Sequence, residues 1–109
     1  EILRDREFCL GVNGAHFIIT RDGKASSPED YVAHVAYLLK KLGPDKVGLG
    51  LDLCDCLEHF SGPTPGREDV IPTHSELPEL IQLLREELGD EQAEKVAFSN
   101  WVSFFRKHL

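Results

Sequence analysis

The sequence predicts an α/β fold built from parallel strands with helices packed outside them. Two short apolar runs, at residues 8–13 and 46–52, have the length and composition of buried strands. A segment with helical periodicity at residues 28–42 separates them, and two further helical segments follow. Strands that alternate with helices form right-handed βαβ units, so we expect the two strands to be parallel.

The first strand, residues 8–13, is followed by a helix whose start and end are marked in the sequence. Ser27 is a suitable N-cap, and Pro28 suits the first helical position. Gly43 and then Pro44 end the helix. Apolar residues recur at spacings of four, three and four and therefore share one face: Tyr31, Val35, Leu38 and Leu42.

The second strand, residues 46–52, is apolar at consecutive positions, as expected of a parallel strand covered on both faces. Its two glycines, Gly48 and Gly50, indicate close packing, because glycine weakens a strand unless something must approach it closely. The strand ends at Asp52. A long loop at residues 53–74 follows, and loops of this length are often functional.

Helices are expected at residues 76–88 and 91–107. Ser75 is the expected N-cap of the first, and Gly89 ends it. One face of this helix is apolar: Leu77, Leu80, Ile81, Leu84 and Leu88. The last helix carries aromatic residues that we expect in the core, Trp101, Phe104 and Phe105.

Two parallel strands make a poor domain by themselves, because both edges of the pair stay unpaired. A complete (β/α)8 barrel needs about 250 residues. The 109 residues therefore suggest the C-terminal βαβα portion of a (β/α)8 TIM barrel, spanning residues 1–109.

Composition excludes several kinds of partner. The formal charge is −7, from 19 acidic and 12 basic residues, and no Lys/Arg stripe is present, which argues against nucleic acid and anionic membranes. No apolar run approaches the roughly 18 residues of a membrane span. The odd count of three cysteines, without an export signal, predicts free thiols in the cytoplasm.

Residues 47–52, Val-Gly-Leu-Gly-Leu-Asp, resemble the final-strand signature V-G-I/L-G-x-D of the renal (membrane) dipeptidase family of zinc peptidases. In the same order, residues 10–13, 27–35 and 77–84 resemble the preceding strand, the intervening helix and a closing helix of that family. The similarity spans nearly the whole chain. After the strand the family often reads D-F-D-G, whereas here Leu53-Cys54-Asp55-Cys56 follows Asp52.

The resemblance implies hydrolysis of dipeptide amide bonds by water that a pair of zinc ions activates. It gives Asp52 the catalytic place at the end of the last strand, in contact with a metal or with the bridging water, where it accepts a proton and passes it to the leaving amine. The other family ligands, a His-x-Asp pair, a bridging Glu and two His, would lie before Glu1. We therefore expect this chain alone to be inactive and to lack zinc, with the missing barrel portion and a dipeptide as its partners.

Other interpretations remain open at this point. Asp52 would also serve as a strand-end residue that caps the next turn, and turn chemistry equally explains Asn13. Cys54, Cys56 and His59 suggest a small thiol or metal-binding protein, but their C-x-C-x-x-H spacing lacks the second ligand pair of a structural zinc site. The main alternative function is a non-catalytic module that forms homo-oligomers by covering its open strand edges.

Three of the histidines fit ordinary structural roles. His16 and His74 are expected in loops, hydrogen-bonded or solvated, and His34 at the border of a helix face.

Overall fold

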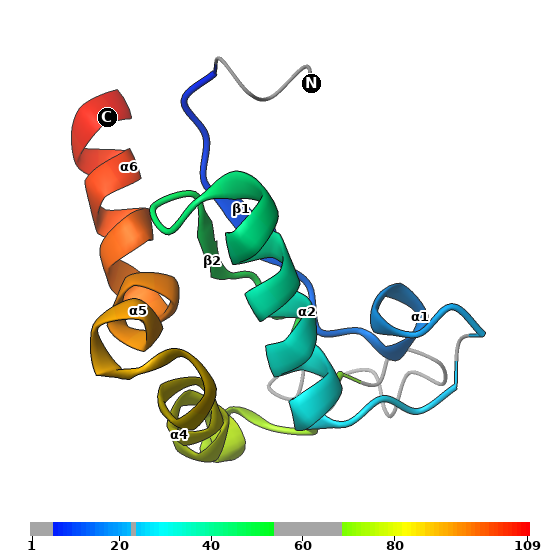
Figure 1. Cartoon of the computed structure of the whole chain (residues 1–109). Coiled ribbons are helices and arrows are strands. Elements are labelled where there is room, and N and C mark those ends of the chain that lie inside the picture. The colour runs from blue at the N-terminus through cyan, green and yellow to red at the C-terminus, as the bar shows by residue number, and fades with distance from the viewer. Residues whose placement is uncertain (1–5, 23, 54–68) are drawn as a thin grey trace, which may run out of the picture.

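Two short parallel strands lie at the centre of the structure, a computed structural model that describes residues 6–22, 24–53 and 69–109. β1 (Leu10–Val12) pairs with β2 (Val47–Leu49), with Leu10 opposite Val47 and Val12 opposite Leu49. The helix α2 (Pro28–Leu42) connects them and lies along the sheet (Figure 1). The predicted α/β class with parallel strands is thus confirmed.

Both strands are shorter than the predicted ranges of 8–13 and 46–52. On β1 the ladder stops where Asn13 begins a turn, its Oδ1 accepting the N–H of Ala15 at 2.8 Å. On β2 the backbone continues in contact with β1 for one more bond, from the N–H of Gly50 to the carbonyl of Val12 at 3.1 Å. At the end of β1, turn chemistry therefore ends the strand before the apolar run does.

The helix predicted at residues 28–42 begins and ends where the sequence indicates. The Ser27 N–H donates to Asp30 Oδ2 at 2.8 Å, and the Asp30 N–H donates to Ser27 Oγ at 3.2 Å, which is a capping box. At the other end Gly43 adopts φ +102°, a conformation that favours glycine. A short helix, α1 (His16–Ile19), precedes this segment.

The last part of the chain is a run of helical pieces: η1 (His74–Glu76), α4 (Leu77–Leu88), α5 (Asp90–Glu94), the π-helical η2 (Lys95–Ser99) and α6 (Asn100–His108). The prediction that Ser75 is the N-cap is wrong. Ser75 lies inside the 3-10 turn, and the N-cap is Thr73, whose N–H donates to the Glu76 carboxylate at 3.1 Å. The reason is that Thr73 and Glu76 have the spacing of a capping box, which stabilises a start two residues earlier.

The core lies on the face of the sheet that carries Val12 and Val47. α2 packs against β2, and α4 packs against α2. The side chains of Tyr31, Leu80 and Leu84 are fully buried in this core. Burying an aliphatic or aromatic side chain of this size stabilises a protein by about 1.5–3 kcal/mol. The Tyr31 hydroxyl also donates to the Val12 carbonyl at 2.8 Å, which ties α2 to β1.

Trp101 of α6 covers the opposite face of the sheet, where two glycines lie side by side. A Cβ atom on Gly48 would lie 2.4 Å from Trp101 Nε1, and one on Gly11 would lie 3.1 Å from Trp101 Cζ2. The indole N–H also donates to the Leu49 carbonyl at 2.8 Å. The glycines of the strands are therefore explained by the indole ring packed directly on the backbone.

We expect Gly48→Ala to lower the free energy of unfolding by about 1–3 kcal/mol, because the added methyl group overlaps the indole ring. In a Trp101→Ala background the same change should cost much less, since the ring is gone. Urea unfolding of the four proteins of this cycle measures the coupling. If Gly48→Ala lowered the free energy of unfolding equally in both backgrounds, the Trp101 ring would not be the reason for glycine at this position.

Candidate functional site

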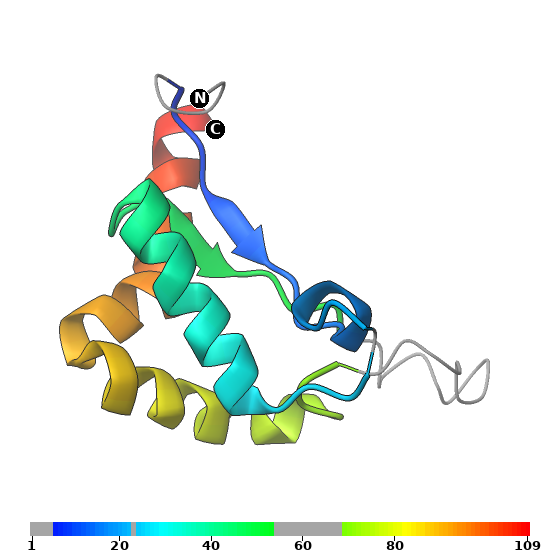
Figure 2. The same cartoon turned by 45° about the vertical axis from the view of Figure 1, so that its right-hand side comes forward.

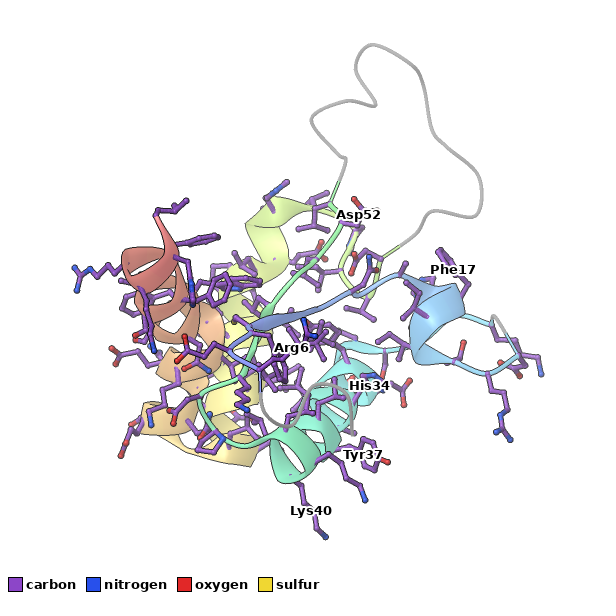
Figure 3. The ribbon with its side chains drawn as sticks, turned by 90° about the horizontal axis from the view of Figure 1, so that it is seen from above. Arg6, Phe17, His34, Tyr37, Lys40 and Asp52 are labelled. Carbon is purple, nitrogen blue, oxygen red and sulfur yellow. The ribbon has the colours of Figure 1, made fainter. Side chains whose placement is uncertain are left out.

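The carboxyl ends of β1 and β2 point the same way, toward α1 (Figure 2). In parallel α/β folds, ligands bind at this end of the strands. Asp52 follows β2 at this end and is exposed. Figure 3 shows it well away from Lys40, which lies near the carboxyl end of α2. The structure therefore places the sequence-predicted Asp52 at the end of the strands where a site is expected.

A second carboxylate, that of Asp69, is hydrogen-bonded to the backbone of Asp52. The Asp52 N–H donates to Asp69 Oδ2 at 3.2 Å, and the Val70 N–H donates to Asp69 Oδ1 at 2.8 Å. Asp69 is only 8% exposed. It also forms an isolated antiparallel bridge with Ala15, the residue before α1. One buried carboxylate thus connects the segments that follow both strands.

Gly14 is required by this arrangement. A Cβ atom on Gly14 would lie 2.0 Å from Asp69 Oδ1 and 2.6 Å from Leu51 Cδ2. The Gly14 carbonyl accepts the Val70 N–H at 3.0 Å, so the backbone after β1 lies directly against the carboxylate. Only glycine leaves room for that approach.

Burial is the main reason why the pKa of Asp69 is raised above its ordinary value. The N–H groups of Asp52 and Val70 and the nearby His16 act in the opposite direction, because they favour the ionised carboxylate. The Asp52 carboxylate adds to the upward shift by repulsion. Among the groups that lower the pKa of Asp69, the backbone N–H donors of Asp52 and Val70 therefore act more strongly than His16.

His16, at the start of α1, is held by Ser26. The Ser26 N–H donates to His16 Nδ1 at 3.0 Å, and the Ser26 hydroxyl lies 2.7 Å from the same nitrogen. Because Nδ1 accepts a backbone N–H, the neutral ring carries its proton on Nε2. His16 is thus a hydrogen-bonded residue at a helix start, and Ser26 is buried beside it.

Other residues singled out in the sequence do not join this group. The amide oxygen of Asn13 accepts a turn N–H, as turn chemistry predicts. His74 is exposed in η1, and His34 is half-buried on α2. The pKa of the half-buried Cys9 thiol is raised by burial. Cys54, Cys56 and His59 lie outside the described residues, so the thiol or metal site that they suggested stays a prediction.

Sequence reasoning missed Asp69, because it falls in the segment at residues 53–74 that was predicted as a loop. A signal was present: the apolar pair Val70 and Ile71 follows Asp69 directly, and both residues are buried. An apolar pair inside a polar loop indicates a stretch that returns to the core.

The described residues offer no metal centre of their own. Across residues 6–22, 24–53 and 69–109, no three His, Cys, Asp or Glu side chains are arranged so that they could hold a metal ion. The pair of zinc ions implied by the family resemblance therefore does not fit the described residues of this chain by themselves.

In the described part of the chain, no helix combines the length and apolar character that crossing a membrane requires. The sequence matches no family model and no curated protein, and the structure matches no solved structure.

Proposed function

We propose that this chain is the C-terminal βαβα portion of a (β/α)8 barrel dipeptidase, in which Asp52 accepts a proton during hydrolysis of a dipeptide amide bond. The observation that carries the proposal is the place of Asp52 at the carboxyl end of the second of two parallel strands. Active sites of barrel enzymes lie at this end of the strands. The family resemblance of residues 47–52 supplies the reaction class.

The chemistry assigned to Asp52 is proton transfer. A carboxylate within hydrogen-bond reach of a nucleophilic water accepts its proton as the water attacks the amide carbon, and then donates a proton to the leaving amine. Asp52 is exposed, so water and substrate can reach this position. Its backbone is fixed by Asp69, which limits the positions that its side chain can occupy.

The family resemblance assigns the His and Glu metal ligands to segments that precede this chain. In the proposal these ligands come from preceding barrel units. We therefore expect the sequence before Glu1 to contain a His-x-Asp strand, a bridging Glu and two further His.

The experiment has two parts. The first is to determine the coding sequence upstream of Glu1. The second is to express the longest protein that it encodes and to measure zinc-dependent hydrolysis of a panel of dipeptides. Turnover by that protein, with none by residues 1–109 alone, is the expected result. Absence of the upstream ligands, or dipeptide turnover by residues 1–109 alone, would contradict the proposal.

A second candidate function, a self-associating module without catalysis, is favoured by the outer edge of β2. The ladder turns the carbonyls of Val47 and Leu49 away from β1. Asn100 Nδ2 donates to the first at 2.8 Å, and the indole N–H of Trp101 donates to the second at 2.8 Å. A closed barrel would use these carbonyls for the next strand, whereas an independent module would cap them in this way.

The solution mass of residues 1–109 separates the two candidates. A module that pairs through the remaining edge of β1 should sediment as a multiple of 12.2 kDa at micromolar concentration. Under the barrel proposal, the upstream part of the protein covers this edge instead. Sedimentation of the longer protein and of residues 1–109, measured side by side, shows which partner covers it.

A further inference from the structure

We propose that Asp69 is the positioning residue for Asp52, acting through the backbone N–H of Asp52 and not on substrate. The inference rests on the proposed function for the role of Asp52, but the contact itself is independent of any activity. Asp69 and Asp52 are separated by 17 residues in sequence and meet after β2, where the Asp52 N–H donates to the Asp69 carboxylate. Figure 3 shows where Asp52 lies.

The two carboxylate oxygens of Asp69 have separate tasks. Oδ2 accepts the Asp52 N–H at 3.2 Å, and Oδ1 accepts the Val70 N–H at 2.8 Å. The second bond orients the carboxylate, because it links the group to the backbone of its own segment. The first bond then fixes the peptide plane of Asp52, and with it the direction in which the Asp52 side chain leaves the backbone.

The loop after β1 completes the support. Gly14 lies so close to Asp69 Oδ1 that a Cβ atom would be 2.0 Å away, and its carbonyl accepts the Val70 N–H at 3.0 Å. The carboxylate is therefore enclosed on the β1 side and has little freedom to move. A catalytic group needs support of this kind, because small displacements of a reacting group are costly to the rate.

A carboxylate suits this place better than an amide. Two N–H donors converge on its two oxygens, and asparagine has one acceptor oxygen and one NH2 group. In Asp69→Asn, therefore, one of the two N–H groups faces another donor. The side-chain volume hardly changes, so this variant tests the hydrogen bonds and not the packing.

The first test is amide hydrogen exchange of residues 1–109. We expect Asp69→Ala to speed exchange of the Asp52 amide by about 10- to 100-fold, the range for losing a bond to a charged group. Asp69→Asn should speed exchange of the Asp52 amide when the NH2 group faces it. When the NH2 group faces Val70, the change there should be small, because the Gly14 carbonyl still accepts the Val70 N–H at 3.0 Å. Asp30→Ala is a matched control, because Asp30 accepts the N–H of Ser27 in the same way. Asp30→Ala should speed hydrogen exchange of the Ser27 amide and leave exchange of the Asp52 amide unchanged.

The second test is kinetic and uses the longer protein. Asp69→Asn should lower kcat by about tenfold or more, with a smaller change in KM, as expected when a reacting group is displaced. In an Asp52→Asn background the same change should have almost no further effect on kcat, because Asp69 acts only through Asp52.

The outcomes separate this inference from the proposed function. Unchanged exchange of the Asp52 amide in Asp69→Ala would overturn the positioning role. Additive losses of kcat in the double variant would overturn it as well. If the longer protein has no dipeptidase activity but the Asp52 amide responds to Asp69, the proposed function fails and the structural contact stands.

Discussion

Asp52→Asn should lower kcat for dipeptide hydrolysis by the longer protein about 10²- to 10⁴-fold, the range for loss of a general acid–base group. Asparagine has nearly the same shape but cannot accept the proton from water. The backbone N–H that Asp69 holds is unchanged by the substitution, so the fold at the end of β2 should persist. Steady-state kinetics with a dipeptide, together with thermal unfolding of both proteins, measures the effect.

The control for this variant lies at the other end of the same strand. Asp45 precedes β2 and forms an exposed ion pair with Lys95 at 3.1 Å. Asp45→Asn should leave kcat unchanged and alter the free energy of unfolding by at most about 1 kcal/mol. If Asp52→Asn retained half of the wild-type kcat, or if Asp45→Asn were equally damaging, Asp52 would not be the proton acceptor.

Leu84→Ala should lower the free energy of unfolding by about 2–5 kcal/mol, the range for a leucine truncated in a packed core. Leu84 is fully buried in the core that α2, α4 and the Val12 face of the sheet form together. Native proteins have free energies of unfolding of only about 5–15 kcal/mol, so this variant would lose a large part of its stability. The measurement is urea unfolding followed by circular dichroism.

Leu109→Ala is the matched control, since it removes the same atoms from a side chain that is 100% exposed. Its free energy of unfolding should stay within about 0.5 kcal/mol of the wild-type value. Similar unfolding midpoints for the two variants would mean that Leu84 of α4 is not part of the packed core.

The helix α2 shows how much of the fold local sequence signals can predict. Its N-cap, its apolar face and its terminal glycine all act within a few residues of each other, and the predicted and observed bounds agree. The parallel pairing of β1 and β2 follows from the same local pattern, because a helix between two buried strands makes the crossover. The location of Asp52 after β2 could likewise be read from the strand that precedes it.

What the sequence by itself determined, therefore, is the order of strand, helix and strand, and the acid at the end of the second strand. The partnership of Asp52 with Asp69 and the packing of Trp101 on Gly48 were decided only by tertiary structure. The physical reason is the separation along the chain: 17 residues in the first case and 53 in the second leave no local pattern to reveal the contact. Contacts of this kind form only when the burial of distant segments brings them together.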